Sequence, residues 1–142
     1  MDTSVLFQAL YSNAGASHAI LRLVRESAVK LAISVPVFGE YQDVLRRPEK
    51  LKELGRSAQE MTTVLNFIAF IGRPFPVYFR MRPNLRDEND NAFVELAFAS
   101  GSSHLITKNI RDFTVDSDLR LDQLRIVTPA QFMKEWREKH GD

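Results

Sequence analysis

Three carboxylates lie where a strand of an α/β protein would give way to a helix, or in the first turn of that helix. They are Asp2, Glu40 and Asp90. In an open parallel sheet such points lie along one edge, so residues far apart in the sequence can share one pocket. Neighbouring carboxylates repel each other unless a cation lies between them, and hard divalent ions such as Mg²⁺ or Mn²⁺ prefer oxygen ligands. The arrangement predicts metal-assisted hydrolysis.

Further polar side chains accompany these acids. Thr107 follows a short apolar run, and its hydroxyl would orient water. Either Asn109 or Asp112 would supply a further oxygen ligand to the ion. The hydroxyl of Ser4, two residues after the first acid, would hold water or phosphate. The segment that contains Thr107, Asn109 and Asp112 is the fourth part of the chain in the predicted site.

Each acid also has a purely structural explanation. Asp2 would be a solvated acid near the end of the chain. Glu40 would be stabilised near the N-terminus of its helix by about 0.3–1 kcal/mol. Asp90 suits the N-cap position of the helix that follows it. Taken singly each signal is weak, but acids at strand edges followed by helices, repeated in order, rarely arise by accident.

The elements that must position these residues alternate between helix and strand. Helical spacing and capping signals predict helices over residues 16–30, 36–47, 57–71, 91–100 and 129–138. Short apolar runs predict strands over 31–35, 76–79, 104–107 and 124–127, and the polar stretch 82–89 is expected to be a loop. This alternation favours a parallel sheet covered on both faces, within one domain spanning residues 1–142.

The start of the chain is at odds with this pattern. A parallel sheet of this kind would have a strand leading into Asp2, yet only Met1 precedes it. Either the sheet lacks that strand, or residues 3–6 serve as it, or the natural chain begins further upstream. The sequence leaves all three possibilities open.

The composition narrows the classes of protein. With no cysteine, the chain has no disulfide, thiolate zinc site or thiol nucleophile, which fits a reducing cytoplasm. No apolar run reaches the roughly 18–20 residues that span a bilayer. The net charge of +1 means that a nucleic-acid partner would have to meet a local basic patch. One basic stretch, which includes Arg82 and Arg86, runs directly into the acidic residues around Asp90.

At this point the residues resemble the PIN-domain family, and within it the bacterial and archaeal toxin-like nucleases related to VapC. The matching stretches are residues 2–6 with 9–10, 33–34 leading to 40–48, 87–90 with 93–97, and 105–107 leading to 112–113. The resemblance implies a three-layer α/β/α sandwich with a central parallel sheet. It also implies metal-dependent ribonuclease activity.

The resemblance further implies which residues form the site. Asp2, Glu40 and Asp90 match three acids of the family that would hold Mg²⁺ or Mn²⁺. The family often places a fourth acid two residues after the strand threonine, where this chain has Asn109. A neutral amide holds an ion less strongly than a carboxylate, and Asp112, slightly later, would substitute for the missing acid.

We therefore expect an endoribonuclease that hydrolyses RNA phosphodiester bonds as the toxin of a toxin–antitoxin pair. Arg82 and Arg86 would steer the phosphate backbone. The family implies a small antitoxin protein as partner and a homodimer. The alternative is a catalytically weakened PIN-like module that binds RNA or a partner protein. A phosphatase of the haloacid-dehalogenase type fits less well, because it needs a second Asp where Ser4 stands.

Overall fold

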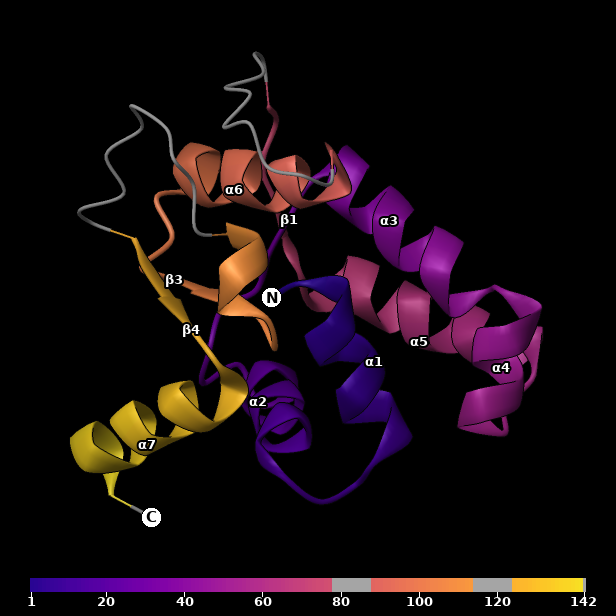
Figure 1. The fold of residues 1–142 in the computed structure, drawn as a ribbon, viewed down its shortest axis with the longest axis horizontal. Coiled ribbons are helices and arrows are strands. Elements are labelled where there is room, and N and C mark those ends of the chain that lie inside the picture. Colours follow the sequence, from indigo (N-terminus) through magenta and orange to yellow (C-terminus); the bar gives the residue numbers. More distant parts are fainter. Residues whose placement is uncertain (78–87, 114–123, 142) are drawn as a thin grey trace.

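The computed structural model of the chain describes residues 1–77, 88–113 and 124–141 (Figure 1). Helices make up most of this part. They are α1 (Thr3–Tyr11), α2 (Ala16–Arg25), α3 (Val35–Leu45), α4 (Pro48–Leu54), α5 (Ala58–Ile71), α6 (Glu88–Ser100) and α7 (Pro129–His140), with a 3₁₀-helix at Ile110–Phe113. The strands are β1 (Ala32–Ile33), β2 (Arg73–Pro74), β3 (His104–Ile106) and β4 (Arg125–Val127).

The strands form two parallel pairs. Strand β1 pairs with β2, with Ala32 opposite Arg73. Strand β3 pairs with β4, with Leu105 opposite Ile126. The predicted parallel pairing is therefore confirmed. The predicted single central sheet of a three-layer sandwich is not, because within the described residues the pairs form separate two-stranded sheets.

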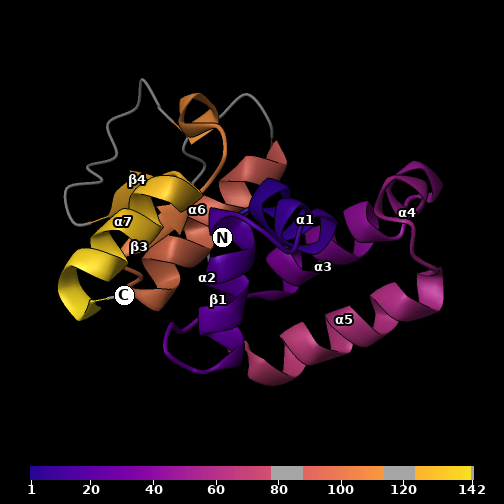
Figure 2. The same cartoon turned by 90° about the horizontal axis from the view of Figure 1, so that it is seen from below.

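The core joins helices to both strand pairs. Helix α6 contacts α3, β1 and β3, while α2 contacts α1 and α7. Helices α3, α4 and α5 extend to one side in both views (Figures 1 and 2). The larger core cluster includes Leu6, Val24, Leu31, Tyr41, Leu65, Phe93 and Leu105. A second cluster under α7 comprises Val5, Ile20, Ile106, Val127, Phe132 and Met133.

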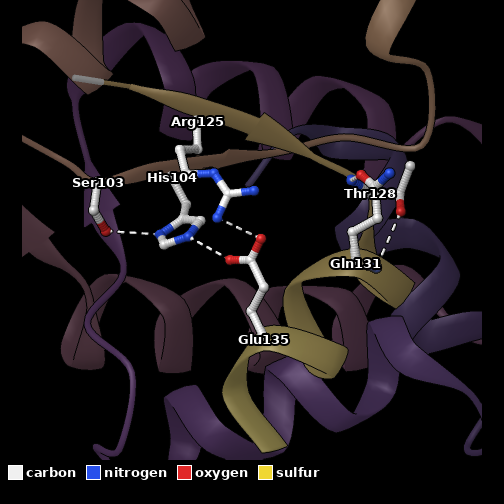
Figure 3. A network of polar contacts seen from close by, with 6 residues as sticks. All are labelled: Ser103, His104, Arg125, Thr128, Gln131 and Glu135. Atoms are coloured by element: carbon white, nitrogen blue, oxygen red, sulfur yellow. Dashed lines mark hydrogen bonds and ion pairs between the residues drawn. The ribbon is translucent and has the colours of Figure 1, made fainter. Parts of the chain in front are cut away.

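Hydroxyl side chains fix where three helices begin. Ser34 caps α3 by accepting a hydrogen bond from the N–H of Val37 at 3.2 Å. Ser57 and Thr128 open α5 and α7 with the capping boxes that the sequence predicts, and in both the third helical residue bonds back to the cap. Figure 3 shows the box between Thr128 and Gln131. These local signals placed the helix starts correctly because they do not depend on tertiary contacts.

Helix α2 is shorter than predicted. It ends at Arg25 rather than at residue 30. Ser27 has a left-handed backbone with φ of 61°, and the N–H groups of Ala28 and Val29 both donate to the carbonyl of Leu23. The chain therefore turns sharply away from the helix axis toward β1.

Pro48 opens a helix as well as ending one. Helix α3 ends at Leu45, and Pro48 is the first residue of α4, which the sequence analysis missed. Proline suits this position because the first helical N–H has no intrahelical acceptor. Gly55, with φ of 64°, then ends α4 in the left-handed conformation.

The region around α6 differs from the prediction in two ways. Strand β2 lies at residues 73–74 rather than 76–79; residues 76 and 77 belong to no strand, and 78–79 lie outside the described residues. Helix α6 begins at residue 88, so the predicted loop ends earlier than expected. Asp90 is therefore not an N-cap but lies in the first turn, where a carboxylate still interacts favourably with the helix dipole.

The start of the chain forms no strand of its own. Residues 3–6 belong to α1, so they cannot serve as the strand leading into Asp2. Asp2 has an extended backbone with φ of −78° and ψ of 171°, and its N–H donates to the carbonyl of Ile106 at 2.9 Å. The first residues therefore lie alongside β3. In the described ranges no helix has the length and apolar character needed to cross a bilayer.

Gly72 allows α5 to approach β1 closely. Gly72 is the C-cap of α5, and its φ of −66° is one that any residue adopts, so the backbone conformation does not require glycine. A Cβ at this position would instead lie 2.8 Å from the carbonyl oxygen of Ile68 and 2.9 Å from two side-chain carbons of Ile33. Space, rather than backbone freedom, requires glycine here.

We predict that Gly72→Ala lowers the free energy of unfolding by about 1–3 kcal/mol, because the added methyl group overpacks the junction. The matched control is Gly39→Ala inside α3, where a Cβ meets nothing within 4 Å. That variant should gain about 0.5–1 kcal/mol from helix propensity. Urea unfolding of both variants and the parent checks this, and a fully stable Gly72→Ala protein would contradict it.

Candidate functional site

An open cavity of ≈ 430 Å³ lies where four parts of the chain meet. They are the start of α1, the first half of α3, the first half of α6 and the segment that follows β3. The lining residues are Asp2, Thr3, Ser4, Glu40, Asp90, Phe93, Lys108, Asn109 and Asp112. The four acids that the sequence analysis selected therefore share one cavity with Ser4 and Asn109. Arg82 and Arg86 lie outside the described residues.

Contacts between elements hold this cavity together. The hydroxyl of Tyr41 in α3 donates to the carbonyl of Met1 at 2.6 Å. The rings of Tyr41 and Phe93 lie 6.1 Å apart between centroids, which joins α3 to α6. Burial, with the charge of Asp2 as a second cause, raises the pKa of the Tyr41 phenol far above its usual range. The phenol therefore keeps its proton and remains a donor.

Asp2 is the most constrained acid of the cavity. Its side chain is 7% exposed and caps α1. The Oδ1 atom accepts from Ser4 Oγ at 2.7 Å and from the Val5 N–H at 3.1 Å. The Oδ2 atom accepts from the hydroxyl of Thr107. These donors offset the cost of burying a carboxylate.

Thr107 positions the carboxylate of Asp2. Its side chain is completely buried and does not line the cavity. Its hydroxyl donates to Asp2 and accepts from the N–H of Asn109 at 3.0 Å. The backbone at the end of β3 directs this side chain toward the carboxylate of Asp2, and the water expected at the hydroxyl stays a prediction.

The remaining oxygen donors lie nearer to solvent. Glu40 and Asp90 are half-buried, whereas Asn109 and Asp112 are exposed. Asp112 belongs to the 3₁₀-helix, which Phe113 anchors in the core with 1% exposure. The Asp112 N–H donates to the Asn109 carbonyl at 3.2 Å, which places both residues on the same tight turn.

Two lining residues were missed by sequence reasoning. Among the described residues, Lys108 is the single cation of the lining, and its ammonium group donates to Gln8 at 3.2 Å. Its position directly after the strand threonine was the signal that could have placed it there. Thr3 is 8% exposed, and its buried hydroxyl has no hydrogen-bond partner within the described part of the chain. Nothing in the sequence around Thr3 indicates that it lines a cavity, because a Ser or Thr often follows an acid at a helix start.

The oxygen atoms that line the cavity are of the types that bind a divalent cation. Carboxylates with one amide oxygen are ligands that Mg²⁺ and Mn²⁺ accept, and a cation would relieve repulsion among the four acids. The acids do not, however, lie close enough together to form a metal site in the described residues. In residues 1–77, 88–113 and 124–141, no group of three or more His, Cys, Asp or Glu side chains could hold a metal ion. Three hydrogen bonds already occupy the two oxygens of Asp2, which leaves about one acceptor position of that carboxylate for an ion.

We predict that Thr107→Val destabilises the protein by about 1–3 kcal/mol. The change keeps the shape of the side chain but leaves the buried Asp2 oxygen and the Asn109 N–H without this partner. Thr63→Val is the matched control, because Thr63 is exposed on α5 and bonds only to a carbonyl of its own helix. Thermal and urea unfolding measure both, and equal stability of the two variants would exclude this role for Thr107.

Comparison with protein families links this geometry to a known group. The model of the PIN domain matches residues 1–111, which include Asp2, Glu40, Asp90 and Asn109 but stop just before Asp112. PIN domains are commonly nucleases and generally use divalent metal ions. Comparison with curated proteins gave no match, and comparison with solved structures gave none. Because the family model covers most of its length, the chain belongs to the PIN domain family.

Proposed function

We propose that this chain is a metal-dependent ribonuclease that hydrolyses phosphodiester bonds in RNA at the acidic cavity. One observation carries the proposal: acids from four separate elements line a single open cavity, in a family whose members are commonly nucleases. Acids placed only for helix capping or solubility would have no reason to converge from segments so distant in the sequence.

The residues divide into ligands and positioning groups. Asp2, Glu40 and Asp90 would hold one or two Mg²⁺ or Mn²⁺ ions, with Asp112 or Asn109 completing the set. A bound ion would supply Lewis acidity, which lowers the pKa of a water molecule and offsets negative charge on the phosphate.

Other side chains at the cavity would hold Asp2 in place or attract the negatively charged RNA. Thr107 and Ser4 hold Asp2 in place through its two oxygens. Lys108 would attract the phosphate backbone to a cavity whose acids would otherwise repel it. Arg82 and Arg86 remain predicted backbone contacts.

The same proposal places the chain in the cytoplasm as the toxin of a toxin–antitoxin pair, with a homodimer as its assembly. Among the described lining residues, an antitoxin segment that entered the cavity would meet four carboxylates and one ammonium group. A segment carrying a basic side chain would therefore complement the lining.

A second function is favoured by a specific observation. Asn109 stands where relatives often have an acid, and the described acids do not close around one point. A cavity of this kind would bind a partner while holding an ion weakly or not at all. The second candidate is therefore a PIN-like module that binds RNA or a partner protein without cleaving it.

We predict that Asp90→Asn lowers RNA cleavage by about 100-fold or more, because it removes a charged ligand while keeping the shape of the side chain. Asp43→Asn is the matched control, since Asp43 lies on the same cavity-forming helix as Glu40 but pairs with Arg47 at the surface, at 2.6 Å. A mixed RNA pool incubated with Mn²⁺, Mg²⁺ or EDTA provides the assay. Cleavage at the parent rate by Asp90→Asn would refute the assignment.

We also predict that Asn109→Asp binds Mn²⁺ about tenfold more tightly than the parent, because affinity in such sites rises with the number of charged ligands. Asn66→Asp is the control, because it adds the same charge on the exposed face of α5. Calorimetric titration separates the two candidate functions. The nuclease requires specific Mn²⁺ binding by the parent chain, whereas the non-catalytic module predicts none.

A further inference from the structure

One stripe of helix α1 leads from the acidic cavity to the surface of the protein. Ser4, Gln8 and Tyr11 follow one another at helical spacing, so they lie along the same face of the helix. Ser4 lines the cavity, Gln8 is half-buried, and Tyr11 is 59% exposed. The rise per residue of an α-helix places Tyr11 about 10 Å further along the axis than Ser4. A substrate that leaves the cavity along α1 therefore passes Tyr11.

Tyr11 forms a stacked pair with Phe7 at the side of this stripe. The two ring centroids lie 6.1 Å apart, and the ring planes differ by 18°. Phe7 is half-buried, whereas more than half of the Tyr11 surface is in solvent. A single exposed apolar side chain is ordinary on a protein surface, but two nearly parallel rings form a surface on which another planar ring can stack.

Two lysines lie beside the aromatic pair. The ammonium group of Lys50, in α4, lies 4.8 Å from the centre of the Phe7 ring. The ammonium group of Lys108 donates to Gln8, the residue after Phe7. Glu53 lies 3.8 Å from Lys50, but in the described part of the chain neither lysine forms a hydrogen bond with a carboxylate. Both charges are therefore held beside the rings, where an anion can reach them.

The segment that packs against α1 on this side is basic. Helix α4 contacts α1, and residues 46–56, which include α4, carry five basic and two acidic side chains, a net charge of +3. The whole chain has a net charge of +1, so positive charge is concentrated here. Proteins bind single strands of nucleic acid by placing aromatic rings under the bases and cations along the phosphates. The surface beside the cavity has both components.

A helix of a partner protein fits this surface less well. A helix that docks on another protein needs apolar contacts at several successive turns. Ser4 and Gln8, which precede Tyr11 on the same stripe, are polar. Polar side chains between a ring pair and a cavity suit the sugars and phosphates of a nucleic acid instead.

We propose that Tyr11 and Phe7 form a stacking platform for a base of unpaired RNA, next to the phosphate that enters the acidic cavity. The inference rests on the proposed ribonuclease function and specifies the form of RNA that the site accepts. Every base has an aromatic face, so the platform takes any sequence, but it excludes a duplex, whose bases are already stacked on one another. Lys108 and Lys50 contact the adjoining phosphates.

The test measures binding of the whole chain to a short fluorescein-labelled RNA in EDTA, where metal-dependent cleavage cannot occur. We expect Tyr11→Leu to raise the Kd about tenfold, because it keeps an apolar side chain but removes the ring face. Tyr11→Phe keeps the ring and should bind within about twofold of the parent. Phe70→Leu is the matched control, because it removes a ring that is 87% exposed on α5 and should leave the Kd unchanged.

A series of RNAs that each lack one base gives a second readout. At one position the missing base should weaken binding by the parent about tenfold and leave binding by Tyr11→Leu unchanged, because the base and the ring contribute one shared interaction. The same strand annealed to its complement should bind the parent more weakly than the unpaired strand.

Three outcomes would overturn the platform. The first is a Tyr11→Leu variant that binds the unpaired RNA as tightly as Phe70→Leu does. The second is equal binding of unpaired and duplex RNA by the parent. The third is a parent chain that binds no RNA, which would leave the aromatic pair to a partner protein. Cleavage with Mn²⁺ is measured separately on the same strands, so a parent that binds through Tyr11 without cleaving keeps the platform and loses only the nuclease.

Discussion

The acidic cavity depends on the buried carboxylate of Asp2. Its two oxygens join the start of α1 to the end of β3, through Ser4 and Val5 on one side and Thr107 on the other. Its backbone N–H makes the same connection through Ile106. A buried carboxylate is costly unless it is fully hydrogen-bonded, so these contacts act as a unit. Asp2 therefore serves the fold and the site together.

This dual role shapes the rest of the cavity. Tyr41 bonds to the carbonyl of Met1 and packs on Phe93, so α3 and α6 are held against the same chain start. Glu40 and Asp90 therefore line the cavity from helices that these contacts hold in position. Asn109 and Asp112 instead lie on an exposed turn, where a side chain can adjust at little cost.

Much of the local structure could be predicted from the sequence, because its signals are local. The capping boxes at Ser57 and Thr128 and the apolar runs of β3 and β4 needed no knowledge of the fold. The end of α2 and the existence of α4 were missed. A turn at Ser27 and a proline that starts a helix are decided by where the chain must go next.

The sequence predicted which side chains gather at the candidate site better than it predicted what each of them contacts there. Acids at strand edges predicted which side chains would meet, because the geometry of parallel strands brings those edges together. The sequence could not show that Thr107 turns beneath Asp2, since that depends on the pairing of β3 with the chain start. The position of Lys108 directly after Thr107 was a signal that it joins the lining, but that signal was weak, because a surface lysine is the commoner outcome.

The C-terminal segment has a consequence for any attempt to shorten this protein. Strand β4 is the only described ladder partner of β3, and α7 covers the second core cluster with Phe132 and Met133. Both elements lie beyond residue 111, where the family match stops. A chain cut at that boundary would keep three of the four acids and Asn109 while stripping β3 of its neighbour. The smallest unit able to fold around those acids is therefore longer than the segment by which the family is recognised.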